Sequence, residues 1–229
     1  MRRSKYLLMA VALKQGSVQK GASVKRRQKK LFKTAAALIC FIGIITAVRL
    51  WYLEEQGNFH PITPGEAYRS AQLDQDELEY YIRKFEIRSV INLRGKNDGE
   101  SWYREETATC RKLDVRHYDL GLSADKAPSS RKIEKLLRIF RIAPRPVLVH
   151  CKAGADRSGL AAALWKVVID GAPKSVAREH LSIRYGHMPF GPTQVLDVFL
   201  ENWVTPTRAR VDAAEIIGEL SNRSEYATD

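Results

Sequence analysis

Cysteine is scarce in this chain, and its scarcity excludes several classes of protein. Only three cysteines, Cys40, Cys110 and Cys151, occur among the 229 residues. So few and so widely spaced, they cannot form the disulfide framework of a small secreted domain. No Cys-x-x-Cys pair or Cys/His cluster has the spacing of a zinc site. The sequence therefore predicts no metal and no other cofactor.

Acidic residues are missing from the N-terminal part of the chain. No Asp or Glu precedes Glu54, whereas twelve of the 38 Lys and Arg residues lie at or before Arg49. The other 26 basic residues are matched by 26 acidic ones, so the net charge of +12 belongs to the N-terminal segment. A domain without excess charge does not require a basic groove, and we predict no nucleic-acid partner.

A run of 15 uncharged residues, 34–48, follows the basic segment 1–30. Neighbouring apolar residues extend this run to 31–53 if Lys33 and Arg49 reach the lipid headgroups. A cleaved signal peptide is disfavoured by the long basic lead and a poor cleavage site, and a buried core helix is disfavoured by the clustered charge. We predict an uncleaved, single-pass transmembrane signal anchor at 31–53. Its N-terminus would be cytoplasmic, with the folded domain on the opposite, periplasmic or extracytoplasmic side.

Helix and strand patterns alternate after the anchor, and a hydrophobic content of 45% is enough to bury a core. Residues 57–65, which hold two prolines and two glycines, are interpreted as a linker. The sequence predicts an α/β domain at 55–206, with a central sheet flanked by helices, and a polar tail at 207–229. The predicted elements are helix 74–85, strands 89–93 and 115–120, helix 133–140, strand 147–149, and helices 160–168 and 196–203.

Residues 150–159, HCKAGADRSG, lie between the strand 147–149 and the helix 160–168. Backbone amides and the helix dipole favour an anion at such a junction. Small residues let the loop amides face a phosphate, while Arg157 can bind two of its oxygens. The same positive field favours the thiolate of Cys151, a nucleophile to which Ser158 can donate a hydrogen bond. The alternative, a structural cysteine followed by an incidental arginine, does not explain this context.

The stretch VLVHCKAGADRSGL, residues 147–160, resembles the phosphate-binding signature of the cysteine-dependent protein tyrosine phosphatase superfamily, particularly its dual-specificity branch. Residues 68–72 (YRSAQ) and 90–94 (VINLR) resemble early segments of bacterial members. The resemblance implies metal-free hydrolysis of a phosphomonoester through a phosphocysteine intermediate on Cys151. The implied phosphate-binding residues are Lys152, Ala153, Gly154, Ala155, Asp156 and Arg157.

The resemblance also implies a general acid, which members of the family carry on a mobile loop before the signature. Asp125, in the matching stretch 120–128, is the first choice, and Asp119 is the second. Asp156 is a third candidate, although a carboxylate at the start of a helix is also favoured by the helix dipole. His150 is expected to brace the loop, and His187 to lie on a helix surface.

The resemblance implies a phosphorylated protein or a phospholipid as the substrate. Lys152 adds a cation that would favour a lipid or another small polyanionic phosphate near the membrane, unless it only faces solvent. A catalytically silent phosphate-binding module is the alternative from another class. The sequence leaves the oligomeric state open.

Overall fold

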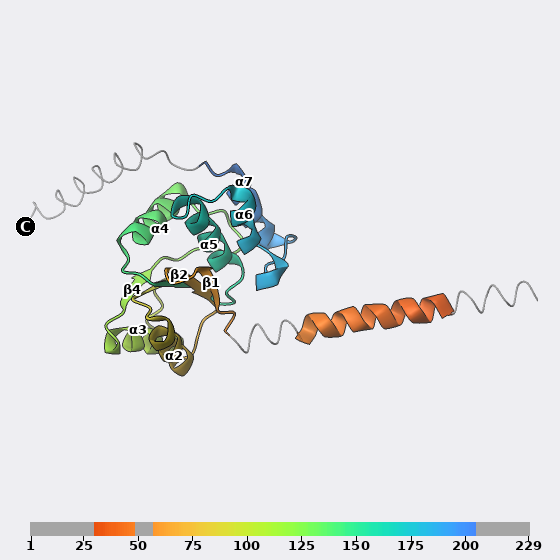
Figure 1. Cartoon of the computed structure of the whole chain (residues 1–229), viewed down its shortest axis with the longest axis horizontal. Coiled ribbons are helices and arrows are strands. Elements are labelled where there is room, and N and C mark those ends of the chain that lie inside the picture. The colour runs from red at the N-terminus through yellow and green to blue at the C-terminus, as the bar shows by residue number, and fades with distance from the viewer. Residues whose placement is uncertain (1–29, 49–56, 205–229) are drawn as a thin grey trace, which may run out of the picture. The chain divides into compact units, whose positions relative to one another are not determined.

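The computed structural model describes residues 30–48 and 57–204 (Figure 1). The chain divides into two compact units, Met1–Tyr52 and Leu53–Asp229. The predicted basic segment up to residue 29, the end of the predicted anchor beyond residue 48 and the predicted tail 207–229 lie outside the described residues.

One long apolar helix, Lys30–Val48, represents the first unit. It has 19 residues and a mean hydropathy of 2.2, and its side chains are exposed. Both of its threonines return their hydroxyl groups to the helix backbone: Thr34 donates to Leu31 O and Thr46 to Ile42 O, each at 2.9 Å. The helix is long and apolar enough to cross a membrane, and an N-terminal signal sequence would meet the same criteria.

A five-stranded sheet forms the centre of the second unit, in the order β1-β2-β5-β3-β4. The strands are β1 His60–Thr63, β2 Ala67–Ser70, β3 Ser89–Asn92, β4 Arg116–Asp119 and β5 Val147–His150. β1 is antiparallel to β2, and the other pairs are parallel. Ser70, His150 and Asn92 are register partners, so three strands end at the same edge. The carboxyl edge of parallel strands is where α/β sheets bind ligands.

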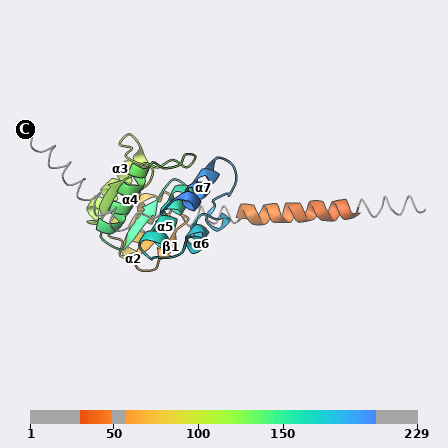
Figure 2. The same ribbon diagram turned by 90° about the horizontal axis from the view of Figure 1, so that it is seen from above.

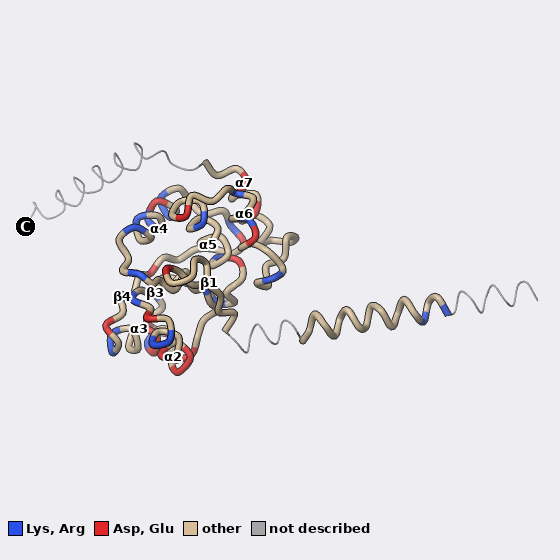
Figure 3. Tube along the Cα trace, in the orientation of Figure 1, with Lys and Arg blue, Asp and Glu red and all other residues tan. Residues whose placement is uncertain are grey.

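Helices cover both faces of this sheet, with α2 and α3 on one face and α4, α5 and α7 on the other (Figures 1 and 2). Basic and acidic residues both occur on the surrounding helices (Figure 3). The α-helices are α2 Gln75–Phe85, α3 Ser101–Lys112, α4 Ser130–Ile142, α5 Asp156–Val168, α6 Lys174–Ala177 and α7 Val195–Asn202; short 3-10 turns occur at Arg178–His180, Ile183–Tyr185 and Pro192–Gln194.

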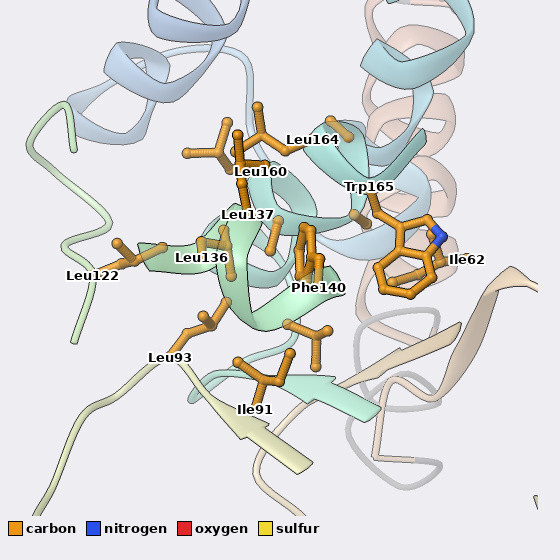
Figure 4. Close-up of a cluster of buried hydrophobic side chains, with 14 of the residues drawn as sticks. Ile62, Ile91, Leu93, Leu122, Leu136, Leu137, Phe140, Leu160, Leu164 and Trp165 are labelled. Carbon is orange, nitrogen blue, oxygen red and sulfur yellow. The ribbon is translucent and has the colours of Figure 1, made fainter. Parts of the chain in front are cut away.

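Alternate residues of the strands face opposite cores. Val90 and Leu148 pack with α2 and α3, whereas the next residues, Ile91 and Val149, pack with the helices of the other face. Figure 4 shows the larger cluster, in which Phe140 of α4 lies among side chains of the sheet and of α5. A sheet buried on both faces requires nearly continuous apolar strands, as β5 has.

The predicted α/β class, with a central sheet flanked by helices after one N-terminal apolar helix, is confirmed. The capping box predicted before the first helix is present, since Glu77 N donates to Asp74 Oδ1 at 2.8 Å and Asp74 N donates to Glu77 Oε2 at 3.0 Å. The interpretation of 57–65 as a linker is wrong, because β1 lies within it. The strand β2 and the helix α3 were not predicted.

Candidate active site

Cys151 follows the last residue of β5, where the chain leaves the sheet to enter α5. Leu93 N donates to His150 O at 2.9 Å and extends the pairing of β3 with β5 to the cysteine. The Cys151 side chain is buried, and its Sγ lies 3.4 Å from Ser158 Oγ in the first turn of α5. The predicted strand, loop and helix thus bring the cysteine and the serine together.

The four carbonyl groups of residues 152–155 bind donors from the start of the domain. Lys152 O accepts from Gln72 N at 3.2 Å, and Ala153 O accepts from Asn58 Nδ2 at 2.9 Å. Gly154 O and Ala155 O both accept from the guanidinium of Arg69. Because a trans peptide group points its N–H opposite to its C=O, carbonyls fixed on this side leave the following amides facing the other way. This arrangement favours an anion on the amide side of the loop.

The guanidinium belongs to Arg69 of β2, which is completely buried. Its NH2 donates to Gly154 O at 2.7 Å and Ala155 O at 2.9 Å, and its NH1 donates to His180 O at 2.7 Å. The guanidinium carbon lies 4.3 Å from the centre of the Tyr185 ring. Burial lowers the pKa of Arg69 from 12.5 to about 10, so the group remains a cation at neutral pH.

Gly154 permits this close approach of the loop to β2. Its φ is +70°, which favours glycine, and a Cβ at this position would lie 2.6 Å from Ala71 N. Both constraints explain why glycine occupies the third position between the cysteine and the arginine. No other residue fits here without moving the loop away from the segment that binds its carbonyls.

His150 braces the loop through a buried carboxylate of α3. Its Nε2 lies 3.2 Å from the carboxylate of Glu106, which also contacts His117 Nε2 at 2.7 Å and accepts from Gln72 Nε2 at 2.6 Å. Burial would raise the pKa of the Glu106 carboxyl, but His150, His117 and Gln72 together hold it well below its usual range. The bracing role expected of His150 therefore has a partner that the sequence did not indicate.

The remaining predicted phosphate-binding residues differ in exposure. Lys152 and Ala153 are exposed, Gly154 and Ala155 are buried, and Arg157 is half-buried. The Nε atom of Arg157 is buried and has no hydrogen-bond partner among the residues described. Arg157 lies in the first turn of α5, and its half-buried guanidinium can offer donors to a phosphate.

The three candidate acids lie in different environments. Asp125 is exposed, and its carboxylate accepts a short hydrogen bond from Ser123 Oγ, which lowers its pKa. Asp119 ends β4 and accepts from Asn92 Nδ2 at 2.9 Å and from the Tyr103 hydroxyl at 2.6 Å. Asp119 is thus held by two donors, whereas the carboxylate of Asp125 is bound only within its own loop in the part of the chain described.

Asp156 is paired with a histidine that the sequence placed incorrectly. His187, expected on a helix surface, is fully buried, with Nδ1 2.7 Å from Asp156 Oδ1 and Nε2 2.8 Å from Asp197 Oδ2. Burial would lower the pKa of His187, but the two carboxylates raise it above the usual value. A histidine between two carboxylates donates from both nitrogens as an imidazolium. Through His187, Asp156 therefore links the start of α5 to Asp197 of α7.

A match to a protein-family model identifies the family of this chain. A family model described as "DSP-PTPase phosphatase fused to NAD+ Kinase" matches residues 59–189, which include the sheet and the cysteine loop. The chain belongs to this phosphatase family. The predicted relationship to the dual-specificity branch of the cysteine-dependent phosphatases is thereby confirmed.

A curated relative supports the same family. The dual specificity protein phosphatase TpbA of Pseudomonas aeruginosa is 30% identical over 116 residues, which are 50% of this chain and 49% of the relative. The chain therefore spans about half the length of the curated relatives it matches.

Two solved structures share the fold. The crystal structure of P. aeruginosa TpbA has a TM-score of 0.52 and 24% identity, covering 70% of this chain and 89% of that one. The core catalytic domain of the PP-IP phosphatase SIW14 from S. cerevisiae, in complex with citrate, has a TM-score of 0.53 and 17% identity, covering 75% and 94%.

Proposed function

We propose that the chain is a cysteine-dependent phosphatase that hydrolyses phosphotyrosine and other phosphomonoesters in proteins. The observation that carries the proposal is the loop from Cys151 to Arg157, whose carbonyls are fixed on one side while Ser158 contacts the cysteine sulfur. Family membership supports the same chemistry, and TpbA is itself named a dual specificity protein phosphatase.

The reaction has two steps. Cys151 Sγ attacks phosphorus, forms an S–P bond and breaks the ester P–O bond, while a carboxylic acid gives its proton to the leaving oxygen. Arg157 and the loop amides bind the phosphoryl oxygens as charge moves onto them. Water then attacks phosphorus while the carboxylate left by the first step takes a proton from it. The S–P bond breaks, and the hydrogen bond from Ser158 stabilises the departing thiolate. Inorganic phosphate leaves.

The test is hydrolysis of an aryl phosphate by the full chain in detergent micelles. Turnover should be unaffected by EDTA and should fall to background in Cys151→Ser. Cys110→Ser is the matched control, since Cys110 is equally buried but packs in the cluster under α2 and α3. Equal turnover of wild type and Cys151→Ser would contradict the mechanism. The measured turnover would then come from a contaminant, and the chain itself would be a silent phosphate-binding module.

Asp125 is proposed as the acid, with Asp119 and Asp156 as alternatives. The hydrogen bonds to Asp119 and Asp156 already engage those carboxylates, whereas the loop of Asp125 leaves it exposed. Asp125→Asn should therefore slow phenyl phosphate, a poor leaving group, at least tenfold more than p-nitrophenyl phosphate. An equal effect on both substrates would reject Asp125 and move the test to Asp119→Asn and Asp156→Asn.

The helix Lys30–Val48 is proposed as a single-pass anchor with a cytoplasmic N-terminus. Its length and hydropathy support this, together with the basic residues before it. A reporter fused after Asp229 should be active only outside the cytoplasm. A cytoplasmic signal, or release of the protein by cleavage, would refute the proposed topology. Phospholipid vesicles tested beside phosphopeptides would identify a lipid substrate near the bilayer.

A further inference from the structure

Arg94 lies directly beside the cysteine loop. Asn92 ends β3 opposite His150, and the pairing continues through Leu93 N to His150 O. The next residue of this strand end, Arg94, is therefore placed next to the point where the loop begins. Leu93 belongs to the core under α4 and α5, whereas Arg94 contacts the side of α3.

The guanidinium of Arg94 is held in a defined position. Its carbon lies 3.5 Å from the centre of the Trp102 ring, and its NH1 donates to Gln72 Oε1 at 3.1 Å. Gln72 is fixed in turn, because its Nε2 donates to the buried Glu106. Trp102 thus covers one face of the guanidinium, and Gln72, which also contacts Glu106, binds one of its edges.

Arg94 has no ion-pair partner in residues 57–204. Burial lowers the pKa of Arg94, and the nearby positive charge of Arg157 lowers it further, while Glu106, Glu100 and Cys151 offset this only in part. Two guanidinium groups within electrostatic reach of each other repel, and an anion bound between or beside them removes that cost. Apart from the bond to Gln72, the N–H groups of the Arg94 side chain have no acceptor among the described residues.

We propose that Arg94 is a second anion subsite, which binds the carboxylate of an acidic residue adjacent to the phosphorylated residue of a peptide substrate. The proposal rests on the proposed phosphatase function and adds a sequence preference to it. A guanidinium presents a planar fork of N–H groups that matches the two oxygens of a carboxylate, and stacking on Trp102 keeps that plane fixed. Arg157 remains available for the phosphoryl group.

The experiment compares two phosphotyrosine peptides that differ only in Glu or Gln beside the phosphotyrosine. We expect wild type to have about tenfold higher kcat/KM for the Glu peptide, as a charge-assisted hydrogen bond predicts. Arg94→Gln should abolish that preference while changing turnover of p-nitrophenyl phosphate, which lacks a second anion, less than twofold. Arg88→Gln is the matched control, because Arg88 is exposed and lies just before the first residue of β3, at the end opposite Arg94. This variant should keep the preference for the Glu peptide.

Three results would overturn the proposal. If Arg94→Gln lowers kcat/KM equally for both peptides and for p-nitrophenyl phosphate, Arg94 serves the reacting phosphoryl group instead. If wild type does not distinguish the peptides, Arg94 binds no neighbouring carboxylate. If an Arg94-dependent preference appears only with vesicles of a doubly phosphorylated lipid, the second anion is a headgroup phosphate. Absence of any wild-type turnover of p-nitrophenyl phosphate would instead reject the proposed function.

Discussion

Replacing Arg69 by leucine tests whether the loop depends on a buried cation from β2. The substitution introduces an apolar side chain of moderate size. It removes the donors to Gly154 O and His180 O and one donor to Ala155 O, which also accepts from Gly159 N at 3.1 Å. Those three oxygens lie in a region where Arg69 is completely buried, so water cannot easily replace the lost donors. The same change also removes the charge that lies over the Tyr185 ring.

The expected loss of stability follows from two opposing contributions. Two carbonyls, Gly154 O and His180 O, lose their donor at about 2 kcal/mol each, whereas Ala155 O keeps Gly159 N. Removing the guanidinium also relieves the net cost of burying its charge, which the fall in the pKa of Arg69 from 12.5 to about 10 places at roughly 3 kcal/mol. We therefore expect Arg69→Leu to lower the free energy of unfolding by only about 1 kcal/mol.

Activity should fall further than stability alone requires. Once the carbonyl of Gly154 is released and that of Ala155 loses one of its two donors, the peptide group after Gly154 can rotate and the loop amides no longer all converge on a phosphate. Loss of one preorganised donor typically costs about 10²-fold in turnover, so Arg69→Leu should lose at least that factor for p-nitrophenyl phosphate at temperatures where it is folded.

The assay pairs urea unfolding, followed by tryptophan fluorescence, with turnover of the same preparation. Arg69→Lys should be intermediate, because an ammonium retains the charge but cannot span three carbonyls as a fork does. Arg88→Leu, at an exposed position, controls for the loss of an arginine. A folded Arg69→Leu protein with wild-type turnover would refute the argument that Arg69 orients the loop.

The structure makes three further predictions. Gly154→Ala should cut turnover at least tenfold, because its φ is +70° and its Cβ would lie 2.6 Å from Ala71 N; p-nitrophenyl phosphate kinetics measure this. The pKa of Glu106 is depressed, so the stabilisation that its carboxylate gives the fold is present above the unfolded pKa of 4.5 and is lost as pH falls. Glu106→Gln should therefore lower the urea midpoint more at pH 7 than at pH 3, whereas Glu105→Gln, at an exposed position, should not show this difference. The pKa of His187 is raised, so the stabilisation that the charged imidazole gives the fold is complete below about pH 6.5 and is lost as pH rises through the folded pKa. His187→Gln should therefore lower the free energy of unfolding by about 3 kcal/mol at pH 6 and by less at pH 9. Equal losses at the two pH values would contradict an imidazolium.

The cysteine loop and its two flanking elements could be predicted because their signals are contiguous. A buried strand, a loop of small residues and an alanine-rich helix occur within 147–168, so local pattern alone orders them. The contact between Cys151 and Ser158 follows from that order, since the first turn of a helix returns toward the loop before it.

The supports of the loop could not be predicted in this way. Arg69 and Gly154 are 85 residues apart, and an arginine in a short strand gives no sign that it will be buried. α3 was missed because its buried face contains Glu106 and Thr109 beside Tyr103 and Cys110, so the usual apolar stripe is interrupted by polar residues. The strand β1 was missed because proline and glycine surround it, which is permitted at the edge of a sheet.

The misplacement of His187 has the same cause. Single residues after a predicted helix carry no periodic pattern, and only the folded chain shows that Asp156 and Asp197 converge on the imidazole from two helices. Burial of a charged histidine is tolerable only with such partners. A polar residue that depends on distant partners is therefore the kind that sequence patterns place worst.

Arg69 and a bound phosphate would act on opposite ends of the same peptide groups. The guanidinium contacts the carbonyl oxygens of Gly154 and Ala155, where each peptide dipole is negative, and an anion would meet the N–H groups, where it is positive. Each charge favours the orientation that the other needs, so the free energy of orienting the loop is supplied during folding instead of during binding. Phosphate affinity should then depend on Arg69 even though Arg69 does not touch the phosphate, and inorganic phosphate should raise the unfolding midpoint less in Arg69→Leu than in wild type.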